Sequence, residues 1–137
     1  MNIDNIIKQL GETPDLSTVL GMEFLSTPED DTCMARMHVD ERNRQPFGYL
    51  SGGASMALAE HLAGIGSICM EPEKICMGIN VTAQHVKTAS EGETVTAVAR
   101  LKHRGNTFHV WDVEITNEAG ELVSTISVTN YIIRTNK

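Results

Sequence analysis

Glu60 is the one carboxylate in a run of small and apolar residues that extends from Gly52 to Ser67. An acid among apolar side chains is unfavourable unless it is protonated, paired or used in a reaction. At the start of the run, Gly52 and Gly53 remove side chains from a place where the free N–H groups of a helix can meet an incoming oxygen atom. A carboxylate and an oxyanion-type donor on one helix indicate acyl-group chemistry.

The spacing of Gly52 and Glu60 limits how they can act together. They are eight residues apart, which is roughly 12 Å along a helix at ~1.5 Å per residue. One acyl carbon cannot lie within reach of both groups of the same helix. We therefore expect Glu60 to come from a second, antiparallel copy of the chain, in a twofold homodimer with two shared sites.

The elements that position these groups follow from hydrophobic periodicity. Ala, Met, Leu and Ile on every side predict a helix that is buried all round, entered through the loop 45–53 and ending near Met70. Residues 1–20 predict two short helical stretches, which end at Gly11 and Gly21. Six strands are expected, at Met22–Thr27, Thr32–Val39, Ile75–Val86, Glu93–Arg104, Phe108–Thr116 and Glu121–Ile133. This order predicts one α+β domain over residues 1–137, with an antiparallel sheet wrapped around the helix.

Composition excludes several classes of function. The net charge of −7 argues against a nucleic-acid surface. The three cysteines are odd in number and have no CxxC spacing, which favours reduced thiols over a disulfide frame or a zinc site. We also expect no metal, no secretory signal and no membrane span, and therefore a cytoplasmic protein. His103 and His109 are expected at exposed strand ends.

Several motifs resemble the hotdog-fold acyl-CoA thioesterases of the phenylacetate-degradation type, a group that includes 1,4-dihydroxy-2-naphthoyl-CoA thioesterases. The similarity covers most of the chain after about Leu16, and the region from Gln45 to Glu60 is its most specific part. The segments that carry it are Gln45–Gly48, Gly52–Ser55, Leu58–Glu60, Ala83–Lys87, Ser90–Gly92 and Arg104–Thr107.

The resemblance implies a role for three residues at the reacting thioester. Glu60 is the implied catalytic carboxylate, as a nucleophile or as a general base on water. The backbone N–H of Gly52 is implied to polarise the thioester carbonyl, and Gln45 to position it through its side-chain amide. Coenzyme A is then part of the substrate, and no cofactor is expected.

Further residues are expected around the substrate. Ser51, Gly53, Gly64, His85 and Met56 are the candidates for substrate binding. Family members often carry His in place of Ser51 and Ser or Thr in place of Gly64, so the polar groups that support the site differ here.

Coenzyme A also needs cations for its phosphates, and the chain as a whole is acidic. The candidates are Lys87 and Arg104, with Asn106 and Thr107 as hydrogen-bond donors. Arg100 and Lys102 lie on the same strand face as Arg104, which by default is a solvated face.

Three functions stay open at this stage. The first is hydrolysis of an aromatic acyl-CoA, with 1,4-dihydroxy-2-naphthoyl-CoA of menaquinone synthesis favoured by the resemblance. The second is a housekeeping thioesterase of broad range, and the third is an acyl-CoA binding protein without hydrolysis. We expect a homodimer that pairs into a homotetramer, and the sequence leaves the choice between dimer and tetramer open.

Overall fold

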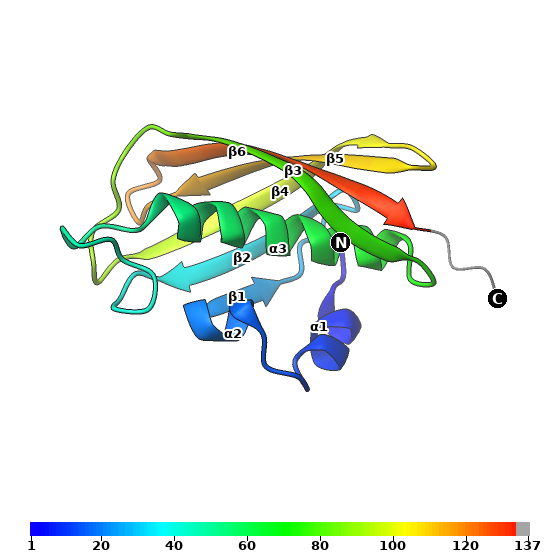
Figure 1. Ribbon diagram of the computed structural model, residues 1–137, viewed down its shortest axis with the longest axis horizontal. Coiled ribbons are helices and arrows are strands. Elements are labelled where there is room, and N and C mark those ends of the chain that lie inside the picture. Colours follow the sequence, from blue (N-terminus) through cyan, green and yellow to red (C-terminus); the bar gives the residue numbers. More distant parts are fainter. Residues whose placement is uncertain (134–137) are drawn as a thin grey trace.

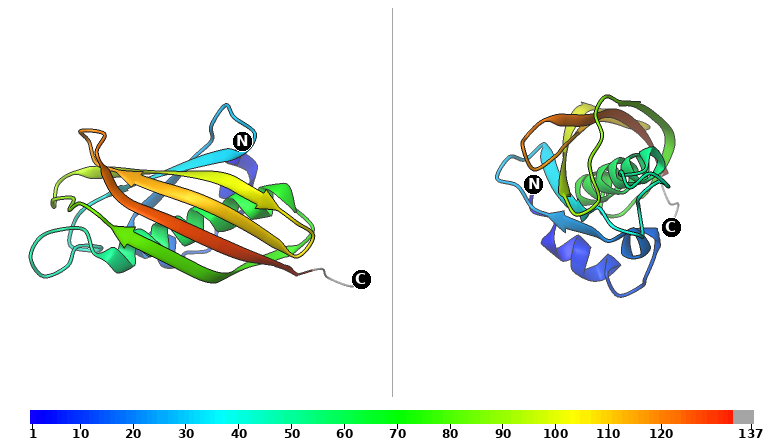
Figure 2. Two further views of the ribbon diagram at one scale, coloured as in Figure 1. Left: turned by 90° about the horizontal axis from the view of Figure 1, so that it is seen from above. Right: turned by 90° about the vertical axis from the view of Figure 1, so that its left-hand side faces the viewer.

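The long helix α3, Gly52–Met70, lies along the concave side of a six-stranded antiparallel sheet in the computed structural model, which describes residues 1–133 (Figure 1). The strand order is β1-β2-β4-β5-β6-β3. A view close to the helix axis shows the sheet curving around α3 (Figure 2). The predicted α+β fold, with a sheet wrapped around one helix, is confirmed. The strands are β1 Met22–Leu25, β2 Thr32–His38, β3 Ile75–His85, β4 Thr94–Arg104, β5 Phe108–Thr116 and β6 Leu122–Ile133.

Both predicted N-terminal helices are present, and they lie beside β1 (Figure 1). Helix α1 covers Asp4–Leu10, and helix α2 covers Leu16–Leu20. The side chain of Asp15 accepts a hydrogen bond at the start of α2 and forms a capping box with Thr18. Gly21 ends α2 at φ 83°, a conformation that favours glycine.

The single chain buries only one side of α3, so the predicted burial all round would need a second chain on the other side. Its buried residues share the side that faces the sheet, whereas Met56, Glu60 and Gly64 are only half-buried and Gly53 is exposed. A sheet can cover one side of a helix, and the short helices α1 and α2 cover only part of the other. The buried residues are Ala54, Ser55, Leu58, Ala59, Leu62, Ala63, Ile65, Gly66 and Ser67.

Close packing at Gly66 brings α3 onto the sheet. A Cβ atom at this position would lie 2.6 Å from Cη2 of Trp111 and 3.2 Å from Sγ of Cys33. Trp111 is fully buried in β5, so its ring has no free space to move into. The sheet therefore accepts only a glycine at this turn of the helix.

A buried polar cluster lies one residue further along α3. The Ser67 hydroxyl contacts Nδ1 of His109 at 2.8 Å, Nε1 of Trp111 at 2.9 Å and Nδ2 of Asn130 at 3.0 Å. His109 is fully buried, so the expectation of a solvated histidine is wrong there, whereas His103 is exposed as expected. Position 109 is the second residue of β5 and faces the helix. Burial lowers the pKa of His109.

The packing of α3 can be tested at two of its glycines. We expect Gly66→Ala to reduce the free energy of unfolding by about 1–3 kcal/mol, because the new methyl group meets Trp111. Gly64→Ala is the matched control, since no atom lies within 4 Å of its added Cβ. It should leave stability unchanged or raise it by up to ~1 kcal/mol through helix propensity. Urea unfolding at one protein concentration measures both, and equal values would contradict the close packing.

Candidate active site

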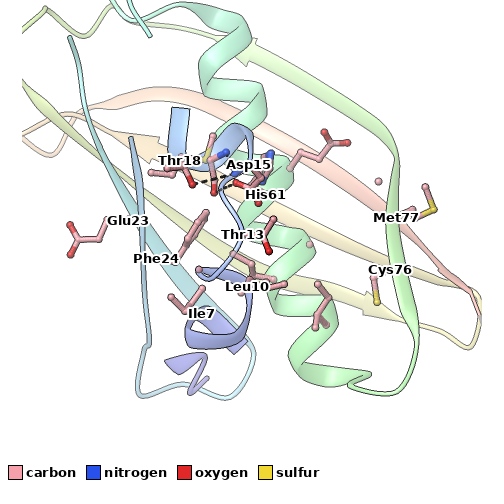
Figure 3. Close-up of a pocket in the computed structure, with 18 residues that line it drawn as sticks. Ile7, Leu10, Thr13, Asp15, Thr18, Glu23, Phe24, His61, Cys76 and Met77 are labelled. Carbon is pink, nitrogen blue, oxygen red and sulfur yellow. Dashed lines mark hydrogen bonds between the residues drawn. The ribbon is translucent and has the colours of Figure 1, made fainter. Parts of the chain in front are cut away.

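The larger of two pockets beside α3 has a volume of about 760 Å³ and contains Glu60 in its wall. We call it the Glu60 pocket. Ile7, Leu10 and Phe24 line one side of it and Met77 of β3 the other, with α3 between them (Figure 3). These four side chains are apolar, and polar ones such as Asp15 and His61 line other parts of the wall, so the pocket can take a hydrophobic group placed next to a carboxylate.

The Glu60 carboxylate lies against the backbone of β3. A Cβ atom at Gly78 would come within 2.3 Å of Glu60 Oε2, so any side chain there would displace the carboxylate. The pairing of β3 with β6 shifts register between Gly78 and Asn80, which indicates a β-bulge next to the acid. Within residues 1–133, Glu60 has no hydrogen bond and no ion pair, and it is half-buried. Its oxygens are therefore available to water or a substrate.

The smaller pocket, of about 320 Å³, lies at the start of α3 and includes Gln45, Gly52, His85 and Lys87. We call it the Gly52 pocket. The side chain of Ser51 makes no capping hydrogen bond at the helix start. The first N–H groups of α3 are therefore not blocked by this side chain, and they can meet an acceptor in the pocket.

Gln45 presents its amide nitrogen to a ligand. Its Oε1 accepts a hydrogen bond from the Phe47 N–H, within the loop that leads to α3. Its backbone N–H donates to Tyr49 O at 2.7 Å, which closes the same turn. Within residues 1–133 the side-chain amide nitrogen makes no hydrogen bond, so this donor is free for a ligand.

The other residues predicted to bind substrate lie in different parts of the structure. Gly64 lines the Glu60 pocket one turn after the acid, and His85 lines the Gly52 pocket. Gly53 is exposed on the first turn of α3, and Met56 is half-buried one turn before Glu60 but lines neither pocket. The structure thus brings Gln45, Gly52 and His85 together, whereas Ser51 precedes α3 and lines neither pocket. It places Glu60 and Gly64 in a second site.

The predicted coenzyme A residues lie near opposite ends of α3. Lys87 lines the Gly52 pocket and forms an ion pair with Glu121. Arg104 donates to the Met70 carbonyl at 3.1 Å, at the far end of α3, and Asn106 and Thr107 follow it in the turn between β4 and β5. One chain alone does not gather these residues around one ligand. Arg100 pairs with Glu29 at 3.1 Å, and Lys102 lies 4.0 Å from Asp112.

Two parts of the site were not predicted from the sequence. Gly78 was not singled out, although a glycine inside a strand is a known signal for a bulge or a close approach of another group. The walls that α1 and β1 provide, through Ile7, Leu10 and Phe24, were also missed. Their apolar residues have the same spacing as ordinary core residues, so no local signal distinguishes them.

Comparison with known proteins identifies the family. The profile of the Thioesterase superfamily matches residues 47–124, which include all of α3 and the strands β3, β4 and β5. The chain belongs to the Thioesterase superfamily. The predicted hotdog-fold resemblance is thereby confirmed, and this thioesterase is a thioester hydrolase.

Three relatives show how far the similarity to this thioesterase extends. It is 42% identical over 105 residues to the 1,4-dihydroxy-2-naphthoyl-CoA hydrolase of Escherichia coli, with 76% of each chain covered. A Pseudomonas aeruginosa thioesterase structure matches with a TM-score of 0.87 at 31% identity, covering 97% of this chain and 94% of that one. A Staphylococcus aureus thioesterase structure matches with a TM-score of 0.80 at 35% identity, covering 87% and 98%.

The Staphylococcus aureus protein has been solved as two variants that bear on this thioesterase. One replaces a glutamine by alanine and the other a glutamate by alanine, at positions 15 residues apart. Gln45 and Glu60 are separated by the same 15 residues.

Within the described part of this thioesterase, residues 1–133, no cluster of His, Cys, Asp and Glu suits a metal ion. The expectation of no metal stays a prediction. In the same residues, α3 and the shorter helices are not long and apolar enough to cross a membrane.

Gly78→Ala tests the position of the Glu60 carboxylate. The added methyl group meets the end of a flexible side chain, so Glu60 moves while the backbone stays in place. We expect kcat for thioester hydrolysis to fall by about 100-fold, because a shift of about 1 Å in a reacting group has that effect. Thiol release measures kcat, and thermal unfolding should change by only a few degrees.

Gly66→Ala is the control, because it strains the packing of α3 against Trp111 but lines neither pocket, so a similar loss of kcat there would trace the effect to packing. An unchanged kcat in Gly78→Ala would show that the contact with Gly78 does not define the working position of Glu60.

Proposed function

We propose that this thioesterase hydrolyses acyl-CoA thioesters with an aromatic acyl group, and that 1,4-dihydroxy-2-naphthoyl-CoA of menaquinone synthesis is its first candidate substrate. One observation carries the proposal: an unpaired, half-buried Glu60 stands in the wall of an apolar pocket of about 760 Å³. The pocket has room for a bicyclic ring system. The 42% identity to the Escherichia coli enzyme supports the choice of acyl group.

The proposed chemistry assigns a task to each predicted catalytic residue. The Gly52 N–H and the Gln45 amide donate to the thioester carbonyl oxygen, on which negative charge develops. Glu60 either takes a proton from the attacking water or attacks the carbonyl carbon itself. In both routes the C–S bond breaks, and the sulfur leaves as coenzyme A thiolate and is protonated. In the first route the attacking water supplies the oxygen of the free acid directly. In the second route the acyl group is left as an anhydride with Glu60, and a water then cleaves this bond to release the free acid and restore the carboxylate. The scheme uses no metal and no redox cofactor.

We infer that two chains share each site. The Glu60 pocket and the Gly52 pocket have no lining residue in common, and the two groups are ~12 Å apart on α3. An antiparallel pairing of two α3 helices places Glu60 of one chain beside Gly52 of the other. The half-exposed side of α3 is available for this contact.

The edge strand β3 supports the same dimer. It pairs only with β6, and its apolar side chains Ile75, Met77 and Ile79 are 51%, 54% and 57% exposed. A free edge with exposed apolar residues is a template for pairing with another chain. Antiparallel pairing across β3 also brings Arg104 of one chain toward Lys87 of its partner. The predicted coenzyme A residues of two chains then lie around one site.

We extend two further expectations as proposals. Dimers pair into homotetramers, and the rings of Phe108 and Tyr131, which are tilted by 58° with centroids 5.7 Å apart, offer an apolar contact on strands β5 and β6. The reaction takes place in the cytoplasm, which agrees with three free cysteines.

The proposed reaction is tested by thiol release over a panel of aromatic and aliphatic acyl-CoAs. We expect the highest kcat/KM with naphthoyl- or benzoyl-type thioesters. Glu60→Gln keeps the shape of the side chain but cannot act as base or nucleophile, so its kcat should fall by ~10³-fold or more. Similar rates on all acyl groups would favour a housekeeping thioesterase, and tight binding without thiol release would favour an acyl-CoA binding protein.

Mixed dimers test the shared site. Gly52→Val blocks the start of α3, since even a Cβ there would lie 2.8 Å from His85 Nε2. Co-refolding Glu60→Ala chains with Gly52→Val chains should restore about a quarter of the wild-type activity, because half of the dimers are mixed and each has one intact site. Mixed dimers that form, as shown by tagged purification, but stay inactive would contradict sharing.

A further inference from the structure

The imidazole ring of His85 covers the start of α3. A Cβ atom at Gly52 would lie 2.8 Å from His85 Nε2 and 2.9 Å from its Cδ2. His85 is the last residue of β3, opposite Ser124 of β6 in the register of the sheet. The ring therefore lies against Gly52, and His85, Gly52 and Gln45 line the same pocket.

The other ring nitrogen is held by Ser124. His85 Nδ1 and Ser124 Oγ are 2.7 Å apart, and Ser124 is fully buried. Among residues 1–133 this is the only hydrogen bond of the Ser124 side chain. The His85 ring is thus fixed at Nδ1 by a hydrogen bond to a buried residue of the sheet.

The burial of Ser124 decides which atom donates. If Nδ1–H donated to Oγ, the hydroxyl hydrogen of Ser124 would be buried without an acceptor, which is unfavourable. If the hydroxyl donates to Nδ1, both groups are satisfied. The second arrangement requires Nδ1 to be unprotonated, so the ring proton is on Nε2.

We propose that Ser124 is a positioning residue that keeps His85 as the Nε2–H tautomer, and that His85 is a third donor to the thioester carbonyl oxygen, beside the Gly52 N–H and Gln45. The inference rests on the proposed function. It excludes His85 as a general base, because Nδ1 is used by Ser124 and Nε2 carries a hydrogen. The opposite tautomer would turn a lone pair toward an oxygen that becomes negative in the transition state.

The tautomer is tested on the resting protein by ¹⁵N–¹H correlation spectra of the histidine rings, with His85→Gln used for assignment. The wild type should show His85 protonated at Nε2 at pH 7.5. Ser124→Ala should show a mixture of tautomers, whereas Ser124→Thr, which keeps the hydroxyl, should resemble the wild type. Protonation at Nδ1 in the wild type, or an unchanged spectrum in Ser124→Ala, would overturn the role of Ser124.

The donor role is tested by kinetics on the substrate with the highest kcat/KM. We expect kcat to fall about 100-fold in His85→Ala and about tenfold in Ser124→Ala, with smaller changes in KM, because the donor acts on transition-state charge. Ser124→Thr should recover most of the rate, and the double variant should be no slower than His85→Ala alone. Additive losses, or no loss of kcat in His85→Ala, would contradict the donor role.

These measurements separate the inference from the function on which it rests. A wild-type protein that hydrolyses no thioester would refute the proposed function and the donor role of His85 together. The ring spectra would still decide whether Ser124 sets the tautomer, since they need no substrate. Melting temperatures identify any variant that has lost its fold.

Discussion

The close contact between α3 and the sheet is the constraint on which the rest of this structure depends. Gly66 lies against the ring of Trp111 without space for a methyl group, and the neighbouring turns of the buried side are mostly small residues such as Ala59 and Ala63. A helix that packs this closely cannot rotate or slide without a clash. Its rotation decides that Glu60 faces Gly78 of the edge strand β3, and its axial position decides where its first N–H groups emerge.

The same rigid helix carries both kinds of chemical group and also keeps them apart. Its first turn opens into one pocket and Glu60 into another, and no bending of a well-packed helix brings them to one carbon atom. The fold thus supplies two incomplete sites that are complementary to each other. In the proposed dimer, the open side of α3 and the free edge of β3 become the same interface, so assembly and completion of the site are one event.

Much of the fold could be predicted from the sequence because the strands alternate strongly. The predicted ends of β5 are those observed, and the end of β4 and the start of β3 also agree. The burial of α3 was less predictable, since its composition shows an apolar environment but not whether the sheet or a second chain provides it. Position 109 looked like an exposed strand end, and only the pairing with β6 shows that it faces the helix.

The site was predictable in its motif and less so in its surroundings. The Gln45–Glu60 segment is local in sequence, so the resemblance located the helix start and the acid together. Gly78 and Ser124 reach the site through strand pairing, and their positions depend on register that no short motif specifies. One side of the Glu60 pocket comes from α1 and β1, which lie far from α3 in the sequence.

The Ser67 cluster links the packing of α3 to proton binding. Ser67 accepts hydrogen bonds from Trp111 and Asn130, so its own hydrogen is left for Nδ1 of His109, and the folded protein holds this imidazole neutral. The unfolded chain binds a proton at His109 below about pH 6.5. Because burial lowers the pKa of His109 in the fold, the cluster contributes fully above that pH. Its contribution is lost as the pH falls toward the folded pKa. A fall in pH therefore weakens the packing of α3 at Ser67, next to its close contact with the sheet at Gly66.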